Sequence, residues 1–232
     1  MPHPHVVVER SAADYLRLLL SRPDRRNALD PGMVRALLEA FGAEPEALVL
    51  LGSTDPRAFC AGADLVISDA QRSEVSDLLY QCYEVMITRP GPVIAVIRGA
   101  AVGGGAQLAT AADLRVAGPA ARLCWAGPPG RELSVGAWLL PDLVGRGAAM
   151  ELTMTGRWVG AAEALRLGLL HQVDNEPEQV AATLAETLLA RPAGSLAKVK
   201  MVTSAGGLLD RLHAERDANR AAWAHPLPSS PG

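Results

Sequence analysis

Cysteine and aromatic residues are both scarce in this sequence. Its 232 residues include three cysteines, Cys60, Cys82 and Cys124, and aromatic residues make up 4%. An odd number of widely spaced cysteines, without a C-x-x-C pair, indicates neither a disulfide framework nor a zinc site. We therefore expect no metal centre, and a reducing, cytoplasmic setting fits best.

An excess of charge of one sign is also lacking. The 22 Lys and Arg residues nearly balance the 25 Asp and Glu residues, the formal net charge is -3, and no run of five basic residues occurs. Such a chain has no electrostatic footprint for nucleic acid or for an anionic membrane surface. We expect neither partner.

No apolar run is long enough to suggest a membrane span. The least charged stretch, residues 91–112, contains Arg98, Gln107 and five glycines. A spanning helix needs about 20 predominantly apolar residues, so this stretch is better interpreted as a buried strand, a glycine turn and a helix. Because 49% of all residues are apolar, the chain can bury a sizeable core.

Strand and helix patterns alternate along the first part of the chain. The predicted strands are Tyr15–Leu20, Ala47–Leu51 and Val93–Ile97, and the predicted helices are Pro31–Phe41 and Glu74–Met86. This alternation predicts a parallel sheet with crossover helices.

The pattern becomes mostly helical from about residue 151, with Ala161–Leu167 and Glu178–Leu189 as the best cases. The sequence therefore predicts three parts. These are a β/α core over residues 1–150, a helical C-terminal region over residues 151–224 and a proline-rich tail over residues 225–232.

Two turns of small residues follow predicted core strands. They are AFCAGAD at Ala58–Asp64 and AVGGGAQ at Ala101–Gln107. Small side chains let a ligand approach the backbone, and the first amides of a helix point outward as donors, so two such turns side by side can hold one oxygen atom. The alternative is that small residues only allow helices and strands to pack closely. Leu108 replaces the last glycine of a dinucleotide-binding G-x-G-x-x-G motif, and no P-loop occurs.

Four segments resemble motifs of the enoyl-CoA hydratase/isomerase (crotonase) family and occur in the same order along the chain as in that family. The resemblance extends from about residue 6 to residue 205. The segments are RPDRRNAL at Arg22–Leu29, AFCAGAD at Ala58–Asp64, PVIAVIRGAAVGGGAQLATAAD at Pro92–Asp113, and the TGR and AAEALRLGL motifs within Thr155–Leu169.

The resemblance implies an α/β fold, the crotonase (ClpP-like) spiral of ββα units with a helical C-terminal region. It also implies a coenzyme A thioester as substrate or ligand and no covalently bound cofactor. By motif position, the backbone amides of Ala61 and Gly104 would form an oxyanion hole for the thioester oxygen. An enolate places negative charge on this oxygen, and loss of one donor typically costs about 2.7 to 4 kcal/mol of barrier.

The family also implies a homotrimer or a hexamer, and a role in fatty acid metabolism. The remaining contacts to coenzyme A are expected from residues around the two turns and from a C-terminal lysine. These residues are Arg25, Arg26, Asn27, Ala28, Leu29, Ala61, Ala63, Asp64, Leu65 and Lys198, with Lys200 as the alternative lysine.

The acid/base positions depart from the family pattern. Hydratases of the family carry one glutamate in G-G-G-x-E and another in a Pro-Glu pair some twenty residues later, and here those positions are Gln107 and Gly127. A general acid or base is worth about 10²- to 10⁴-fold, and glutamine cannot transfer a proton. We therefore expect little ordinary hydration. Glu132 is the nearest candidate carboxylate, although beside Arg131 it also has the pattern of an exposed loop residue.

Three functions are compatible with the sequence. The first is an acyl-CoA isomerase or lyase with altered enolate chemistry, for which Glu132 is the candidate proton carrier. The second is a non-catalytic acyl-CoA-binding or carrier protein, and the third is a structural subunit of a mixed oligomer. A serine peptidase of the related ClpP-like fold is excluded, because no serine occupies the turn Gly103–Gln107.

Overall fold

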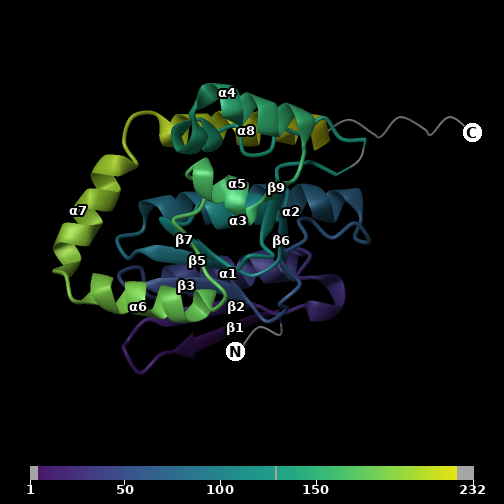
Figure 1. Cartoon of the computed structure of the whole chain (residues 1–232). Coiled ribbons are helices and arrows are strands. Elements are labelled where there is room, and N and C mark those ends of the chain that lie inside the picture. Colours follow the sequence, from purple (N-terminus) through teal and green to yellow (C-terminus); the bar gives the residue numbers. More distant parts are fainter. Residues whose placement is uncertain (1–4, 129, 224–232) are drawn as a thin grey trace, which may run out of the picture.

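The computed structural model describes residues 5–128 and 130–223 (Figure 1). The expected tail over residues 225–232 lies outside the described residues. The described chain forms two sheets flanked by helices. The larger sheet has the strand order β1 (Val6–Arg10), β2 (Leu16–Leu20), β3 (Val49–Ser53), β5 (Val93–Ile97), β7 (Leu114–Ala117) and β10 (Gln172–Val173). The smaller sheet has the order β4 (Ala58–Cys60), β6 (Ala100–Val102), β8 (Arg122–Cys124) and β9 (Val159–Gly160).

The helices alternate with these strands along the chain. They are the short 3-10 helix η1 (Pro23–Arg25), α1 (Pro31–Ala43), α2 (Asp69–Thr88), α3 (Gly104–Thr110), α4 (Leu140–Thr155), α5 (Ala161–Arg166), α6 (Pro177–Leu189), α7 (Ala193–Thr203) and α8 (Leu208–Trp223).

Successive units of the core place one strand in each sheet and then a helix. β3 and β4 precede α2, β5 and β6 precede α3, and β7 and β8 precede α4. Within each sheet all neighbouring strands are parallel except the outer pairs β1/β2 and β8/β9. This arrangement is the spiral of ββα units that the family resemblance implies, and that prediction is confirmed.

Strand β5 shows why the central strands read as continuous apolar runs. Val93, Ala95 and Ile97 belong to the main core beneath α1 and α2, whereas Ile94 and Val96 belong to a second apolar cluster beneath α6. Successive side chains of a strand point to opposite faces, so a strand covered on both faces must be apolar throughout. The predicted bounds of this strand match the observed ones.

Helix α2 begins earlier than the apolar pattern predicts. The sequence places its start near Glu74, but the helix starts at Asp69. The Ser68 side chain accepts a hydrogen bond from the amide of Gln71, and the Gln71 side chain bonds back to the Ser68 amide, which is a capping box. This cap stabilises a first turn that the apolar stripe does not cover.

The C-terminal region packs on the core. Helix α4 crosses residue 150, β9 pairs with β8, and β10 pairs with β7. Helix α8, at the yellow end of the chain in Figure 1, packs against α2. The helices predicted after residue 151 are present as α5 and α6, and α8 reaches the region where the two turns meet.

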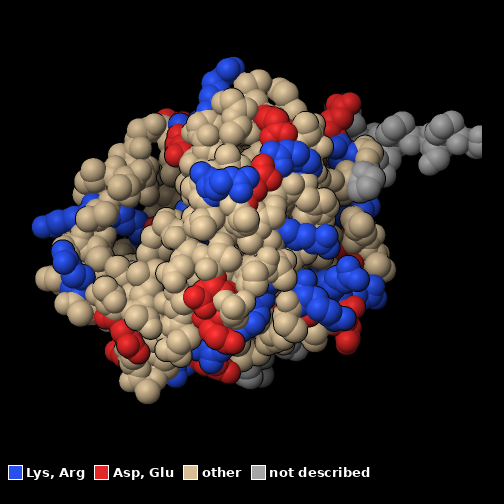
Figure 2. Space-filling view, viewed as in Figure 1, with Lys and Arg blue, Asp and Glu red and all other residues tan. Residues whose placement is uncertain are grey.

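The surface shows no dominant charge on the face drawn in Figure 2, where acidic and basic side chains are interspersed among large uncharged areas. None of the helices within the described ranges has the length and apolar character needed to cross a bilayer.

Candidate functional site

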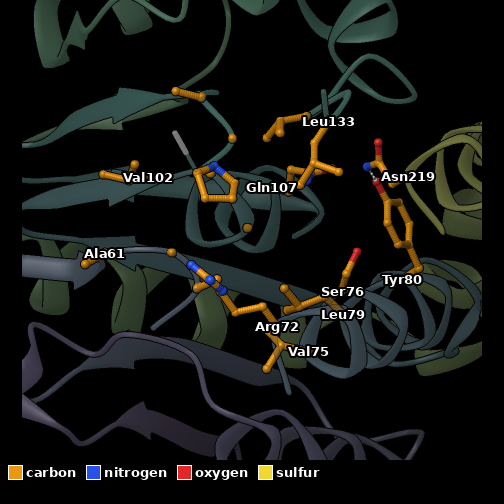
Figure 3. A pocket seen from close by; sticks show the side chains of 18 of the residues that line it. Ala61, Arg72, Val75, Ser76, Leu79, Tyr80, Val102, Gln107, Leu133 and Asn219 are labelled. Atoms are coloured by element: carbon orange, nitrogen blue, oxygen red, sulfur yellow. Dashed lines mark hydrogen bonds between the residues drawn. The ribbon is translucent and has the colours of Figure 1, made fainter. Parts of the chain in front are cut away.

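A cavity of about 190 Å³ lies between the two turns of small residues and helices α2 and α8 (Figure 3). Strands β4 and β6 are parallel neighbours in the smaller sheet. The turns that follow them therefore leave the sheet at the same edge. Ala61 to Ala63 line the cavity from one turn, and Val102 to Gly104 line it from the other. The structure thus brings together the two segments that the sequence singled out.

The small residues of the turns also serve packing. A Cβ atom at Gly105 would lie 2.6 Å from the Cβ atom of Cys60, and one at Gly104 would lie 2.7 Å from Cδ1 of Leu79. At Gly105 the Cβ atom would also lie 2.6 Å from the backbone oxygen of Cys60, so glycine is needed there for close approach of α3 to β4. At Gly104 the contact is with the end of a flexible side chain, which can shift. The packing explanation therefore applies at Gly105, in addition to any role in binding.

The backbone amides of the first turn differ in their availability. The amide of Ala61 donates to the carbonyl oxygen of Arg26 at 3.0 Å. This bond corrects the expectation that Ala61 supplies an oxyanion donor, because its hydrogen is already used within the chain. On either side of Ala63, the backbone bonds to Leu29: the Leu29 amide donates to the carbonyl oxygen of Gly62, and the Asp64 amide donates to the carbonyl oxygen of Leu29. The Ala63 amide meets no backbone or side-chain acceptor within residues 5–128 and 130–223.

The amide of Gly104 is the corresponding donor of the second turn. Gly104 is the first residue of α3, so its amide has no partner inside the helix. The Tyr83 hydroxyl donates to the carbonyl oxygen of Gly104 at 2.9 Å and so holds the peptide group that follows Gly104, next to the one that carries the donor amide. Burial raises the pKa of Tyr83 well above its ordinary value, so this group stays a hydrogen-bond donor.

Both positions of the missing glutamates line the cavity. The Oε1 atom of Gln107 accepts a hydrogen bond from the Trp138 indole at 2.7 Å. A Cβ atom at Gly127 would lie 3.4 Å from the Cβ atom of Leu133, so the wall at this position is apolar. Among the described residues, no Asp or Glu lines this cavity. Glu132 is exposed and outside the lining, which corrects its candidacy as the proton carrier.

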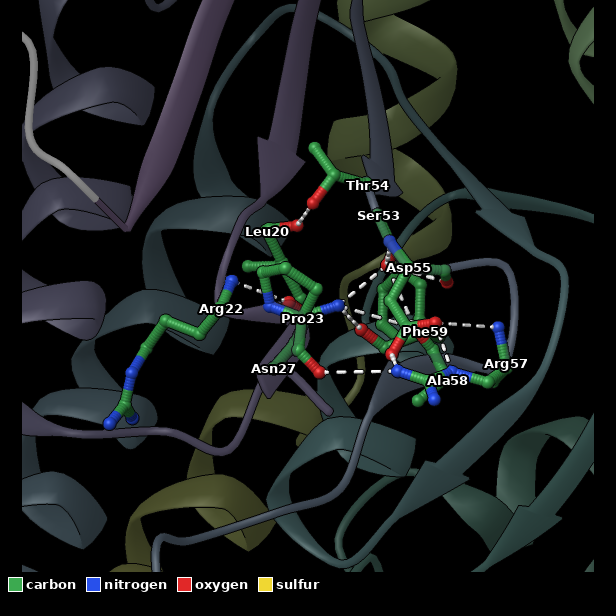
Figure 4. A network of polar contacts seen from close by, with 10 residues as sticks. All are labelled: Leu20, Arg22, Pro23, Asn27, Ser53, Thr54, Asp55, Arg57, Ala58 and Phe59. Carbon is green, nitrogen blue, oxygen red and sulfur yellow. Dashed lines mark hydrogen bonds and ion pairs between the residues drawn. The ribbon is translucent and has the colours of Figure 1, made fainter. Parts of the chain in front are cut away.

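The expected contact residue Asn27 instead braces the first turn (Figure 4). Its side chain is fully buried, and its Nδ2 atom donates to Oγ of Ser53 at 2.6 Å and to the carbonyl oxygens of Ala58 and Phe59. Its Oδ1 atom accepts from the amide of Arg22 at 2.7 Å. Every polar atom of this side chain is used inside the protein, so Asn27 positions the turn and does not face a ligand.

Asp64 is a second brace of this turn. Its carboxylate accepts from the amide of Val66 and pairs with Arg22, each at 3.0 Å. Burial alone raises the pKa of Asp64, but the Val66 amide and the Arg22 guanidinium outweigh it and hold the pKa below its usual value. Asp64 is therefore a structural anion.

The other expected coenzyme A contacts divide into two groups. Ala61, Ala63 and Leu65 line the cavity, and Leu65 is 60% exposed at its mouth. The others do not line it: Ala28 and Leu29 are buried, Arg25 and Arg26 are exposed near η1, and Lys198 and Lys200 lie on α7. Lys200 is buried and pairs with Asp113 at 2.8 Å, so the alternative lysine has a structural role.

The sequence analysis missed the side chains that α2 and α8 contribute. Tyr80, Ser76 and Arg72 from α2, and Asn219 and Trp223 from α8, line the cavity. These residues have no motif, and their register on amphipathic helices is the only signal that places them inward.

A buried carboxylate that the sequence analysis also missed lies behind this wall. Glu215 on α8 is 6% exposed and accepts the Tyr80 hydroxyl at 2.9 Å. Burial raises the pKa of Glu215, although its hydrogen bonds oppose that shift. Within the described parts of the chain, no three His, Cys, Asp or Glu side chains cluster as metal ligands would.

Comparison with known proteins agrees with this architecture. Residues 13–228 match the family model for enoyl-CoA hydratase/isomerase. The Bacillus subtilis (strain 168) protein YngF, whose name assigns it provisionally to the enoyl-CoA hydratases/isomerases, is 39% identical over 170 residues. That match covers 67% of this chain and 64% of YngF, which is less than two thirds of the relative's length.

Solved structures extend the likeness over nearly the whole chain. An enoyl-CoA hydratase from Mycobacterium avium subsp. paratuberculosis K-10 superposes with a TM-score of 0.87 at 26% identity, covering 97% of this chain and 96% of that chain. A monofunctional enoyl CoA isomerase from M. smegmatis superposes with a TM-score of 0.75 at 28% identity, covering 89% and 94%. With the ββα spiral and the paired turns, these matches show that the chain belongs to the enoyl-CoA hydratase/isomerase family.

Proposed function

We propose that this protein binds an acyl-CoA thioester and catalyses enolate chemistry of the isomerase or lyase type, with little ordinary hydration. The observation that carries the proposal is the cavity itself. Two backbone amides without acceptors, those of Ala63 and Gly104, line a cavity that no carboxylate lines among the described residues.

The two amides suit a thioester oxygen. Removal of a proton from the α-carbon moves negative charge to this oxygen, and fixed donors stabilise that charge more than they stabilise the neutral thioester. A free carboxylic acid is ionised at neutral pH and forms no such enolate readily, so the geometry favours thioesters.

Ordinary hydration needs more than these donors. A water molecule must be held and deprotonated while a proton is delivered, and family hydratases use two glutamates for this. Gln107 and Gly127 occupy those positions, and the Gln107 amide is held by Trp138. An isomerisation requires only that one proton leaves one carbon atom and returns to another, and the isomerase among the structural relatives supports this class.

A non-catalytic acyl-CoA-binding protein is the second candidate. The absence of a carboxylate from the described lining favours it. Titration calorimetry with hexanoyl-CoA, hexanoate and coenzyme A tests the binding proposal, which predicts that only the thioester binds tightly. Proton NMR in D₂O then separates the candidates, because an enzyme exchanges the α-protons of bound hexanoyl-CoA and a carrier does not. Absence of hexanoyl-CoA binding would contradict both.

Association into a homotrimer or hexamer also belongs to the proposal. Val199, Met201 and Val202 on α7 are 62%, 67% and 66% exposed, and such a group of exposed apolar side chains supports contact between copies. Sedimentation velocity is the direct measurement, and a purely monomeric protein would contradict this part. A role in fatty acid metabolism is the corresponding expectation for the pathway.

A further inference from the structure

Tyr80 connects the cavity to the buried carboxylate of Glu215. Its hydroxyl donates to Oε1 of Glu215 at 2.9 Å and accepts from Nδ2 of Asn219 at 2.8 Å. Figure 3 shows the Tyr80 ring and Asn219 meeting at the cavity wall. Tyr80 and Asn219 line the cavity, whereas Glu215 lies behind them.

Glu215 is held as a hydrogen-bond acceptor on both of its oxygens. Oε1 accepts from Tyr80 and from the amide of Gly136 at 3.0 Å, and Oε2 accepts from Oγ of Ser134 at 3.0 Å and from the amide of Trp138 at 3.1 Å. Four donors fill the acceptor sites of an ionised carboxylate. No ion pair to Glu215 occurs in the described part of the chain. The charge is therefore stabilised by dipoles alone, and it remains able to take up a proton.

The ionisation of the two groups fits a shared proton. Burial and the neighbouring Glu215 raise the pKa of Tyr80, so a free tyrosinate does not form and the phenol needs a partner to act as a base. Burial also raises the pKa of Glu215, which brings this carboxylate closer to the strength that a base requires near neutral pH.

We propose that Tyr80 is the proton-transfer residue of this site and that Glu215 takes up the proton through it. The step rests on the proposed function, because the charge it creates is held at the amides of Ala63 and Gly104. The α-carbon of a β,γ-unsaturated acyl-CoA loses a proton to Oη of Tyr80, and the C–H electron pair forms the enolate. The hydroxyl proton of Tyr80 passes at the same time to Oε1 of Glu215.

The second half of the reaction restores the protein. Tyr80 delivers a proton to the γ-carbon, Glu215 returns its proton to Oη, and the double bond moves into conjugation with the thioester. One proton leaves the substrate and one returns, so no oxidant, reductant or second substrate is needed. The relay thus explains how a cavity that no carboxylate lines among the described residues can move a proton.

The first test compares Tyr80→Phe with Tyr15→Phe, using 3-hexenoyl-CoA as the probe. Tyr15 is buried in the second apolar cluster, away from this cavity, so its variant controls for the loss of a buried hydroxyl. Isomerisation is followed by the ultraviolet absorbance of the conjugated thioester, and binding by calorimetry. We expect Tyr80→Phe to lower kcat about 10²-fold or more. Its Kd for 3-hexenoyl-CoA should stay within about threefold of that of the unchanged protein. The substitution leaves in place both amides that are proposed to hold the thioester oxygen, those of Ala63 and Gly104. Tyr15→Phe should keep both values.

The second test is Glu215→Gln, which keeps an acceptor for Tyr80 but cannot take up a proton at neutral pH. Its kcat should fall as far as that of Tyr80→Phe, with Kd again little changed. If Glu215 only ties α8 to α2, the melting temperature falls while kcat per folded molecule is retained. With its oxygen kept toward Tyr80, the new side-chain amide would face the backbone amide of Trp138, so we expect Glu215→Gln to be less stable. Tyr80→Phe is therefore the decisive variant.

The outcomes separate the two proposals. A kcat of isomerisation for Tyr80→Phe that lies within about threefold of the value for the unchanged protein overturns the relay. The relay is also overturned if the unchanged protein binds 3-hexenoyl-CoA without isomerising it. In both cases acyl-CoA binding stands. A protein that binds no acyl-CoA contradicts the proposed function and the relay together.

Discussion

The amide of Ala61 donates a hydrogen bond to the carbonyl oxygen of Arg26, with 3.0 Å between the nitrogen and the oxygen. This bond fastens the first turn to the loop that follows η1. Two residues later the Ala63 amide is left at the cavity, and Gly62 between them has φ of +85°, a conformation that side chains rarely adopt. The identity of the available donor is therefore set by Gly62 together with the neighbouring loop.

The first prediction follows from this turn. A Cβ atom at Gly62 would lie 2.9 Å from the carbonyl oxygen of Val102. Gly62→Ala should lower the free energy of unfolding by about 1 to 3 kcal/mol, through strain at positive φ and this contact. It should also weaken hexanoyl-CoA binding, because the two turns move apart. Chemical denaturation and calorimetry measure the two effects.

The matched control is Gly42→Ala in α1, where a Cβ atom meets nothing within 4 Å. It should leave binding unchanged and stabilise the helix by roughly 0.5 to 1 kcal/mol. Equal binding by both variants and the unchanged protein would contradict the role given to the Ala63 turn.

The second prediction concerns the two lysines of α7. Lys200 is buried and bonds to Asp113 at 2.8 Å, whereas Lys198 is exposed. Lys200→Met leaves Asp113 without its cation and should lower the free energy of unfolding by about 1 to 3 kcal/mol. Lys198→Met should change stability by less than about 0.5 kcal/mol. Urea denaturation of both variants is the measurement, and equal stabilities would refute the assignment of Lys200 as structural.

The third prediction is a pH dependence that depends on Asp64. Its pKa in the folded protein lies below the ordinary value of 3.8. The unfolded chain thus binds the proton first as the pH falls, so the stabilisation by ionised Asp64 is complete above about pH 5 and is lost at lower pH. The difference in unfolding free energy between the unchanged protein and Asp64→Asn should shrink as the pH falls from about 5 towards 3. A difference that is independent of pH would show that Asp64 is not an ionised brace.

Much of the core could be predicted from the sequence because its signals are local. The run Val93–Ile97 is bounded by proline and glycine, and its apolar character reflects cover on both faces. The two turns of small residues were also identified from the sequence, but the strands that end in them, β4 and β6, and their parallel pairing were not predicted.

The finer features of the site depend on partners that are distant in sequence. The choice between Ala61 and Ala63 depends on a carbonyl at Arg26. Glu215 has the pattern of an ordinary charged helix residue, and only folding brings it to Tyr80 and to the backbone at Gly136. No local pattern distinguishes these residues from solvated ones.

The last prediction concerns Gln107→Glu, which restores one carboxylate to the cavity wall. The two side chains are nearly isosteric, and the Trp138 indole can donate to either, so the fold should be kept. Syn hydration in the family uses two carboxylates, and Gly127 still supplies none. The new carboxylate would also be buried, because Gln107 is 5% exposed, and burial disfavours its ionised form. The turnover number for hydration of crotonyl-CoA, measured by the loss of absorbance of the conjugated thioester, should therefore stay well below the ordinary enzyme range of roughly 1 to 10³ per second.

Glu132→Ala in the same background should leave this turnover number unchanged, since Glu132 is exposed outside the cavity. Fast hydration by Gln107→Glu alone would mean that another carboxylate already acts as the second group. Loss of that rate on adding Tyr80→Phe would then identify Glu215, acting through Tyr80, as that group.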